Sequence, residues 1–292
     1  MKKLKLLLVL VAVTLTAISC DSKGDSQKHD QDQSTSSPKK AEKILVLYYS
    51  QTGTTRAVAQ EISKRIGADI EEIVMVDPYE EDYDATIKRC LKEREQGFVP
   101  SIQPVKADIS RYDVIFIGYP VWFGTYAPPV AAFLDSVDLS GKKVVPFCTF
   151  GSGGLESSIK DLEAAEPKAT ILPGYGVRAA RMEAMPSEVA RFLIAYGFMD
   201  GEYAPLDEFS ESREVSKEEE AIFNAAVKGY KMLNAKAKTV ASRSVPDGTE
   251  YLFTAVDKPR KKAKSKMPPA GEIQVYVLVA DGEAPVFTKV VR

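Results

Sequence analysis

The chain has 292 residues and is 45% hydrophobic, which is long and apolar enough for roughly two domains with a sizeable core. A net charge of -2 demands neither a nucleic acid nor a strongly anionic partner. Three cysteines are too few for a disulfide framework, and a single histidine, His29, narrows the possible catalytic chemistry.

Residues 1–20 have the composition of an export signal. A positive start, "MKKLK", precedes the apolar stretch "LLLVLVAVTLTAI", which is too short and too early for an ordinary membrane-spanning helix. The stretch ends in "TAISC", which resembles a bacterial lipoprotein signal and implies that Cys20 is lipidated and anchors the exported protein to the cell envelope. Leu15 stands five positions before Cys20 rather than three, so an ordinary secretory signal cut nearby is the alternative.

Residues 21–42 are polar and contain no aromatic side chain, so we expect a flexible tether. His29 lies in this tether, and the folded part would therefore contain no histidine. That excludes Ser-His-Asp and Cys-His catalysis, which need an imidazole beside the nucleophile. The sequence also lacks CxxC, HExxH and EF-hand patterns, so we assign neither catalytic residues nor metal ligands.

Residues 43–201 alternate between strand and helix patterns. Continuous apolar strands separated by amphipathic helices are typical of an α/β fold whose parallel sheet is covered on both faces. Pro146 would be awkward inside a central strand, so we expect it near the start of the fourth. The predicted strands are 43–49, 69–76, 113–119, 143–150 and 169–174. The clearest helix pattern is Val58, Ile62 and Ile66 at spacing four, closed by Gly67, and the other predicted helices are 84–96, 127–136, 154–164 and 187–197.

Three loops at the carboxyl ends of these strands have unusual composition. "SQTGTT", residues 50–55, offers hydroxyls and small residues where a helix begins, which suits an anion. "YPVWFGTYAPP", residues 119–129, holds the only tryptophan, and "TFGSGG", residues 149–154, lets a backbone approach a ligand. The first loop lacks the Gly-Lys pair of a nucleotide-triphosphate loop, and Glu156 stands where a dinucleotide fingerprint needs its third glycine. A flat aromatic ligand with a phosphate fits all three loops.

Residues 43–200 resemble flavodoxin, and more closely the short flavodoxin-like proteins with a "GYPVW" second loop. The flavodoxin phosphate loop, S/T-x-T-G-x-T, is met by Ser50, Thr52, Gly53 and Thr55. The resemblance implies a five-stranded sheet of order 2-1-3-4-5 and FMN as cofactor. A flavodoxin fold that has lost its cofactor is the alternative.

The resemblance also implies which residues contact FMN. Many flavodoxins place a third-loop tyrosine on the outer face of the flavin, and here Phe150 is the only aromatic in that loop, so either Trp122 or Phe150 would stack. The implied contacts are Ser50, Gln51, Thr52, Gly53, Thr54 and Thr55 at the phosphate, Pro120, Val121, Trp122, Phe123 and Gly124 along the isoalloxazine, and Thr149, Phe150, Gly151, Ser152, Gly153 and Gly154 at its pyrimidine edge.

Residues 202–292 form a second predicted unit, a small α+β domain. A capping box, Ser216 with Glu219, opens a helix, and strand patterns follow at 236–245, 249–257, 272–280 and 285–291. One helix with four antiparallel strands over 216–292 resembles the cystatin-like fold. Ser244 and Pro246 replace two positions of the inhibitory Gln-x-Val-x-Gly motif, so we infer a docking or dimerisation module rather than protease inhibition.

Two basic features bear on partners. "DKPRKKAKSK" carries six basic residues, which indicates either a solvated loop or a contact with an acidic redox partner or an anionic membrane. Arg178 and Arg181 are the only basic residues near the loops that could hold dinucleotide phosphates, and a solvated helix start is the alternative explanation for them. We therefore expect an FMN-dependent electron-transfer protein or flavin oxidoreductase, whose partner is a redox protein or a small-molecule acceptor and not a nucleic acid. The alternatives are an NAD(P)H-dependent quinone or small-molecule reductase and a non-enzymatic envelope binding protein.

Overall fold

The computed structural model describes residues 42–230, 233–257 and 271–292, which all belong to one compact unit, residues 41–292. The predicted signal with Cys20, nearly all of the tether and most of the basic loop lie outside these ranges. In the ranges described, none of the helices has the length and apolar character needed to cross a bilayer.

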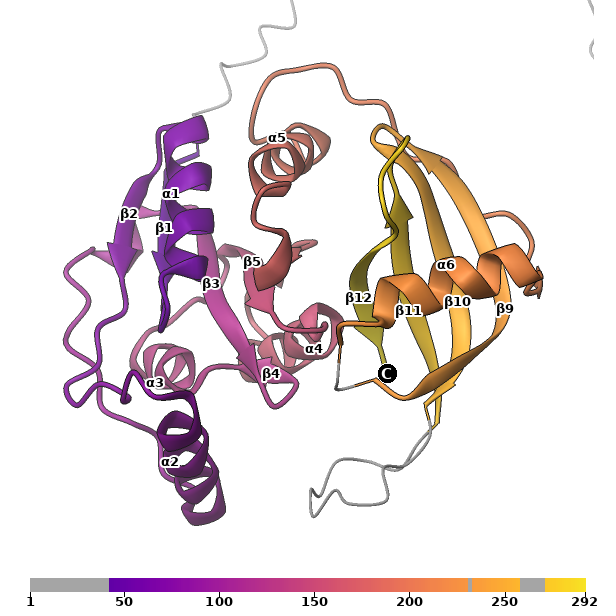
Figure 1. Cartoon of the computed structure of the whole chain (residues 1–292). Coiled ribbons are helices and arrows are strands. Elements are labelled where there is room, and N and C mark those ends of the chain that lie inside the picture. Colours follow the sequence, from indigo (N-terminus) through magenta and orange to yellow (C-terminus); the bar gives the residue numbers. More distant parts are fainter. Residues whose placement is uncertain (1–41, 231–232, 258–270) are drawn as a thin grey trace, which may run out of the picture. The chain divides into compact units, whose positions relative to one another are not determined.

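The first sheet is parallel along its main path and has the predicted order. Its path runs β2-β1-β3-β5-β6, with β4 forming a hairpin on β3 and β7 also pairing with β5. Setting the hairpin aside and taking β6 and β7 as one interrupted strand gives 2-1-3-4-5, so the predicted α/β fold is confirmed (Figure 1). The strands are β1 (Ile44–Tyr48), β2 (Asp69–Glu72), β3 (Val114–Trp122), β4 (Thr125–Tyr126), β5 (Lys143–Phe150), β6 (Thr170–Ile171) and β7 (Tyr175–Arg178).

The fifth predicted strand is interrupted, and Pro146 explains why. We expected Pro146 near the start of its strand, but in the structure it lies well inside β5. The carbonyl of Val144 accepts from Leu172 N at 2.8 Å, so the backbone of Pro146, two residues on, also faces the fifth strand. Proline has no N–H to donate there, and the ladder breaks before it resumes at Tyr175.

The second predicted strand is also shorter than expected. β2 ends at Glu72, level with Tyr48 at the end of β1, so the chain beyond it has no strand to follow. Residues 74–76 instead pair locally with residues 101–103, through Gln103 N to Val74 O at 2.7 Å and Val76 N to Ser101 O at 2.9 Å. The region of residues 77–100 is thereby held beside the carboxyl edge of the sheet.

Helices cover both faces of this sheet, as the sequence predicts. The side chains of α1 and α5 share one apolar core with one sheet face, and those of α2, α3 and α4 share the core on the other. The helices are α1 (Thr54–Ile66), α2 (Tyr83–Gln96), α3 (Pro128–Ser136), α4 (Leu155–Ala165) and α5 (Met185–Ala195), with short 3₁₀ turns at Ile109–Arg111 and Ala179–Arg181 (Figure 1).

A second, antiparallel sheet follows, of order β12-β11-β10-β9-β8, and Phe223 of α6 is buried in its core. The capping box is present, with Ser216 accepting from Glu219 N and Glu219 accepting from Ser216 N. The helix and four long strands are confirmed, whereas the cystatin-like relationship and the domain limits stay predictions. The elements are β8 (Arg213–Glu214), α6 (Lys217–Val227), β9 (Ala235–Val245), β10 (Gly248–Asp257), β11 (Glu272–Val279) and β12 (Val286–Val291).

Candidate functional site

The three loops singled out by the sequence meet at the carboxyl edge of the first sheet. They follow β1, β3 and β5, which are neighbouring parallel strands. Thr55 and Thr149 share a buried hydrogen bond of 2.8 Å, which joins the first loop to the third. The second and third loops touch where the absent side chain of Gly154 makes room for Val121: a Cβ there would lie 2.6 Å from a Val121 methyl.

The first loop presents backbone donors without acceptors. Gly53 occupies the N-cap position of α1 in a left-handed conformation, φ 85°, and has no side chain with which to accept from the first turn. Arg56 N donates to Ser50 Oγ at 3.2 Å and Ala57 N to Gly53 O at 3.0 Å, but the N–H groups of residues 52–55 donate to no other described residue. Unpaired N–H groups at the positive end of a helix form a seat for an anion.

Some side chains of the first loop could bind a ligand, whereas others are already hydrogen-bonded within the protein. Thr52 and Thr54 are exposed or half-buried, with their hydroxyls 3.2 Å apart. Thr55 is buried against Thr149, and Gln51 donates to Glu80 O at 2.9 Å while accepting from Tyr49 Oη at 2.6 Å. The predicted phosphate contacts of Thr55 and Gln51 are therefore limited to their backbones unless these bonds rearrange.

The second loop contains a strained hairpin turn. Residues 122–125 connect β3 to β4, and both central residues have positive φ, 53° at Phe123 and 87° at Gly124. This is the geometry of a type I′ turn, which favours Asn-Gly because a larger side chain is strained there. Phe123 is the only described non-glycine residue with positive φ, and its ring is 43% exposed. Such strain commonly marks a functional position.

Trp122 is held by two tyrosines. Its ring meets Tyr79 edge-on at 5.1 Å and Tyr49 at 6.1 Å, and the side chain is half-buried. Burying one edge leaves the indole with a fixed orientation beside the turn. Trp122, not Phe150, is thus the partly accessible ring of the two: Phe150 is 5% exposed, and a Cβ on Gly176 would lie 2.8 Å from its ring.

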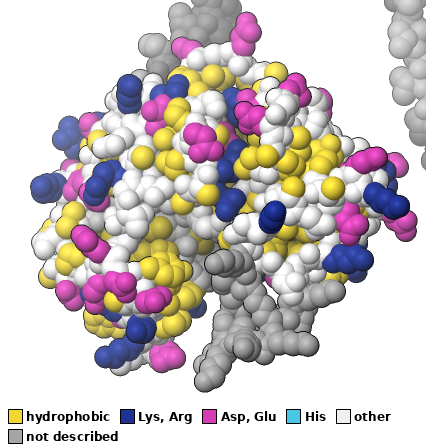
Figure 2. All heavy atoms as spheres, viewed as in Figure 1, with side chains coloured by type: hydrophobic (Ala, Val, Ile, Leu, Met, Phe, Trp, Pro, Cys, Tyr) yellow, Lys and Arg dark blue, Asp and Glu magenta, His cyan; other side chains and the backbone are white. Residues whose placement is uncertain are grey.

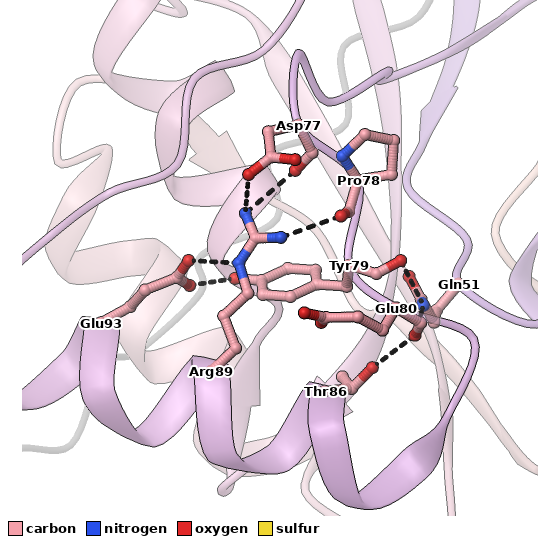
Figure 3. A network of polar contacts seen from close by, with 8 residues as sticks. All are labelled: Gln51, Asp77, Pro78, Tyr79, Glu80, Thr86, Arg89 and Glu93. Carbon is pink, nitrogen blue, oxygen red and sulfur yellow. Dashed lines mark hydrogen bonds and ion pairs between the residues drawn. The ribbon is translucent and has the colours of Figure 1, made fainter.

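A polar network behind Trp122 was missed by the sequence reasoning (Figure 3). Arg89 donates to Glu93 at 2.9 Å, to Pro78 O at 2.8 Å and to Asp77 O at 3.0 Å, and its guanidinium lies 4.7 Å from the centre of the Tyr79 ring. Glu93, 7% exposed, also accepts from Tyr79 Oη at 2.5 Å. The i,i+4 Arg-Glu pair on α2 was its only sequence signal, and such pairs usually face solvent.

This network ties the first and second loops together. The Gln51 amide of the first loop bonds the carbonyls of Tyr79 and Glu80, and the Tyr79 ring supports Trp122 of the second. Arg89 and Glu93 fix Tyr79 from the helix side, as Figure 3 shows. Both hydrogen bonding to Glu93 and burial raise the pKa of Tyr79, burial more strongly, so its phenol stays a neutral donor.

The outside of this region combines apolar and charged side chains. Figure 2 shows hydrophobic and acidic side chains gathered together at the lower left, where Figure 1 labels α2. Tyr83, Leu91 and Phe98 are among the exposed apolar residues there. The Arg94 guanidinium lies 5.0 Å from the centre of the Phe123 ring, which links this surface to the turn of the second loop.

The third loop turns part of its backbone toward the C-terminal sheet. Ser152 O accepts from Val290 N at 2.6 Å, and a Cβ on Gly153 would lie 2.1 Å from Val290 O. Gly153 was predicted to allow close approach by a ligand, and in the structure the close approach is by β12. The N–H groups of Ser152 and Gly153 donate to no described residue.

The two candidate dinucleotide-binding arginines are engaged within the protein. Arg178 donates to Gly151 O at 2.9 Å and to Phe287 O at 2.6 Å, and burial lowers the pKa of its guanidinium. Arg181 is 8% exposed and paired with Glu188 at 2.8 Å. Neither offers a free cationic face beside the loops.

The described cysteines and acidic side chains form no metal site. Cys148 and Cys90 are buried, in β5 and α2, and burial raises the pKa of Cys90 to about 11. Over the residues that the structure describes, no group of three or more His, Cys, Asp or Glu side chains could hold a metal ion.

The chain is similar to several known proteins. Over 100 residues the chain is 30% identical to an NAD(P)H dehydrogenase (quinone) from Cupriavidus metallidurans, covering 32% of this chain and 45% of the relative, less than half its length. A Bacteroides eggerthii protein described as a flavoprotein is 30% identical with a TM-score of 0.46, covering 54% of this chain and 99% of that one. A Lactobacillus acidophilus flavoprotein in complex with FMN is 26% identical with a TM-score of 0.44, covering 47% of this chain and 93% of that one. A flavodoxin family model matches residues 43–199, and the chain belongs to the flavodoxin family.

Proposed function

We propose that the protein binds FMN at the three loops and serves as an electron-transfer flavoprotein. The observation that carries the proposal is the first loop: the N–H groups of residues 52–55 have no acceptor among the described residues, at the start of α1, where the N-cap residue is a glycine. A phosphate monoester would accept hydrogen bonds from these donors, and its negative charge would be stabilised by the positive end of the helix dipole. The same loop would leave them unpaired around a neutral ligand.

The remaining residues suit the rest of FMN. Thr52 and Thr54 would add hydroxyl bonds to the phosphate, and Trp122 and Phe123 would line the isoalloxazine. The N–H groups of Ser152 and Gly153, which donate to no described residue, would meet its polar edge. When bound, FMN supplies one- and two-electron redox chemistry. The protein's part is to orient the ring, shield one side with aromatic side chains and keep the Tyr79 phenol neutral behind them.

A single-electron role is favoured over a dedicated NAD(P)H reductase. A reductase needs a cationic seat for the dinucleotide phosphates beside an open ring face. Arg178 and Arg181 are committed to the carbonyl of Gly151, the carbonyl of Phe287 and the carboxylate of Glu188. The reductase remains the second candidate because of the similarity to the quinone dehydrogenase, which covers 32% of this chain.

The first test is whether the protein retains flavin. Protein reconstituted with FMN and passed through a desalting column should keep one flavin per chain, with the absorbance of a bound flavin. Colourless protein would favour the non-enzymatic alternative. In stopped flow, reduction of the reconstituted protein by NADPH should be slow and unsaturable, and by a one-electron donor fast. Rapid saturable reduction by NADPH would make it a reductase.

We also propose that Cys20 is lipidated and that residues 21–42 hold the flavin domain away from the membrane. About twenty flexible residues reach roughly 25 Å, enough to present the loops to soluble or membrane-bound redox partners. Cys20→Ala should move the protein from the membrane pellet to the soluble fraction. Unchanged fractionation, with no added lipid mass on the wild type, would contradict the anchor.

A further inference from the structure

We infer that β12 of the C-terminal sheet is part of the flavin site: it holds the third loop so that the N–H groups of Ser152 and Gly153 face a ligand. The inference rests on the proposed function, since it concerns the same site. It gives the C-terminal sheet a specific task, the positioning of a loop in the other half of the unit.

Three separate contacts join β12 to this one loop. Val290 N donates to Ser152 O at 2.6 Å, and the Gly153 backbone fits against Val290 O only because glycine has no Cβ. The Lys289 ammonium pairs with Glu156 at 2.5 Å, at the start of α4. All three contacts fall within residues 152–156 of the loop and its helix.

Arg178 forms a fourth link, through the end of β7. Its guanidinium donates to Gly151 O at 2.9 Å and to Phe287 O at 2.6 Å, and it lies 4.4 Å from the centre of the Phe287 ring. A charged side chain that is half-buried between two carbonyls and a ring has little freedom to move. Arg178 therefore acts as a bridge between the loop and β12.

The local shape of β12 suits this task. β12 is the last strand of its sheet, so its outer N–H and C=O groups need partners from elsewhere. The register shifts between Phe287 and Lys289, which leaves Thr288 as an extra residue in a β-bulge. A bulge bends a strand and redirects its side chains, here at the residues that reach the loop.

Holding the carbonyls of the third loop also orients its N–H groups. In a trans peptide the C=O and the following N–H point in opposite directions. Gly151 O is held by Arg178 and Ser152 O by Val290 N, so the N–H groups of Ser152 and Gly153 point away from these partners. These are the two third-loop donors that bond no described residue. Pinning the carbonyls therefore pre-orients the donors before a ligand arrives.

The experiment loosens the contact and measures the loop and the ligand separately. Gly153→Ala introduces a Cβ that would lie 2.1 Å from Val290 O, and Arg178→Leu removes the bridge without touching the glycine. Gly229→Ala is the control for a glycine-to-alanine change outside the loop, because a Cβ there meets no atom within 4 Å. Hydrogen exchange of the flavin-free protein, followed on peptides from 149–157 and 286–292, reports the contact itself.

We expect both variants to speed exchange in the two peptides, and the control to leave 286–292 unchanged. FMN and riboflavin should both bind about tenfold more weakly, by the same factor, because the third loop meets the ring and not the phosphate. Unchanged exchange, unchanged affinity despite faster exchange, or tighter binding would each overturn the inference, the last by showing that β12 obstructs the site. Wild-type protein that binds neither flavin would instead overturn the proposed function along with it.

Discussion

Removing Arg89 should destabilise the protein more than an ordinary surface ion pair would. Arg89→Met leaves the Glu93 carboxylate buried, 7% exposed, with only the Tyr79 phenol as partner, and frees the carbonyls of Pro78 and Asp77. Removing one partner of a fully buried ion pair costs about 3–5 kcal/mol. Because Arg89 is itself partly exposed, water replaces some of the carbonyl bonds, and we expect a total loss of about 3 kcal/mol in the free energy of unfolding.

A double-mutant cycle separates the buried charge from the other losses. Glu93→Gln alone should cost about 1–2 kcal/mol, but Arg89→Met with Glu93→Gln should cost about 1–2 kcal/mol less than the sum of the two, since no buried charge is then left unpaired. The Asp77 carboxylate also loses Arg89 but is exposed to water. Urea denaturation measures the free energy of unfolding of the two single variants and the double variant. In Arg89→Met the emission of Trp122, the only tryptophan, should shift to longer wavelength as Tyr79 loosens.

Arg65→Met is the matched control for Arg89→Met. It breaks an i,i+4 pair with Glu61 on α1 that is away from the network, and it should cost no more than about 0.5 kcal/mol without affecting the Trp122 emission. Additive single variants, or an Arg89→Met loss no larger than the control's, would refute the view that Arg89 and Glu93 act as a unit.

Three further predictions concern single features. Thr55→Val should cost about 1–2 kcal/mol in urea denaturation by leaving the Thr149 hydroxyl unpaired, and adding Thr149→Val should recover part of it; a double variant as costly as the two singles summed would contradict this. Phe123→Asn should raise stability by about 1 kcal/mol by relaxing the positive φ of 53° while weakening FMN binding, so unchanged stability would argue against strain at the turn. Hydrogen bonding from Arg213 lowers the pKa of Glu219 from 4.5 to about 2, so its stabilisation is complete above pH 4.5 and is lost as the pH falls through 2. After allowance for solvent screening this amounts to about 1–2 kcal/mol, and Glu219→Gln, which keeps an acceptor for the cap, should flatten that part of the stability–pH curve.

Much of the fold could be predicted from the sequence because most local sequence patterns match the helices and strands that the chain forms. The start of α1, the strand 143–150 and the four long C-terminal strands follow from periodicity, caps and turns that act within a few residues. The two strand errors arose from partners distant in sequence. Residues 74–76 pair with 101–103 because β1 ends, and the fifth strand breaks opposite Pro146 because a donor is missing across the ladder.

For the candidate site too, the sequence predicted the local features but not the contacts between distant residues. Composition and the flavodoxin motif identified the three loops, which the structure brings together at one edge. The sequence could not assign the bonds within them: Thr55 to Thr149, Gln51 to Glu80, and Gly153 against Val290 join residues 29 to 137 positions apart, and no local pattern encodes such pairs. The burial of Phe150 likewise depends on Gly176, which belongs to another strand.

The most direct test of the account is the affinity of the flavin-free protein for FMN and riboflavin, measured by quenching of flavin fluorescence. If the N–H groups of residues 52–55 seat the phosphate, FMN should bind at least about 100-fold more tightly, because two charge-assisted hydrogen bonds are worth about 3 kcal/mol or more. Thr52→Val should reduce that ratio and leave riboflavin unaffected. Equal affinity for the two flavins would contradict the assignment of the first loop and, with it, the proposed FMN site.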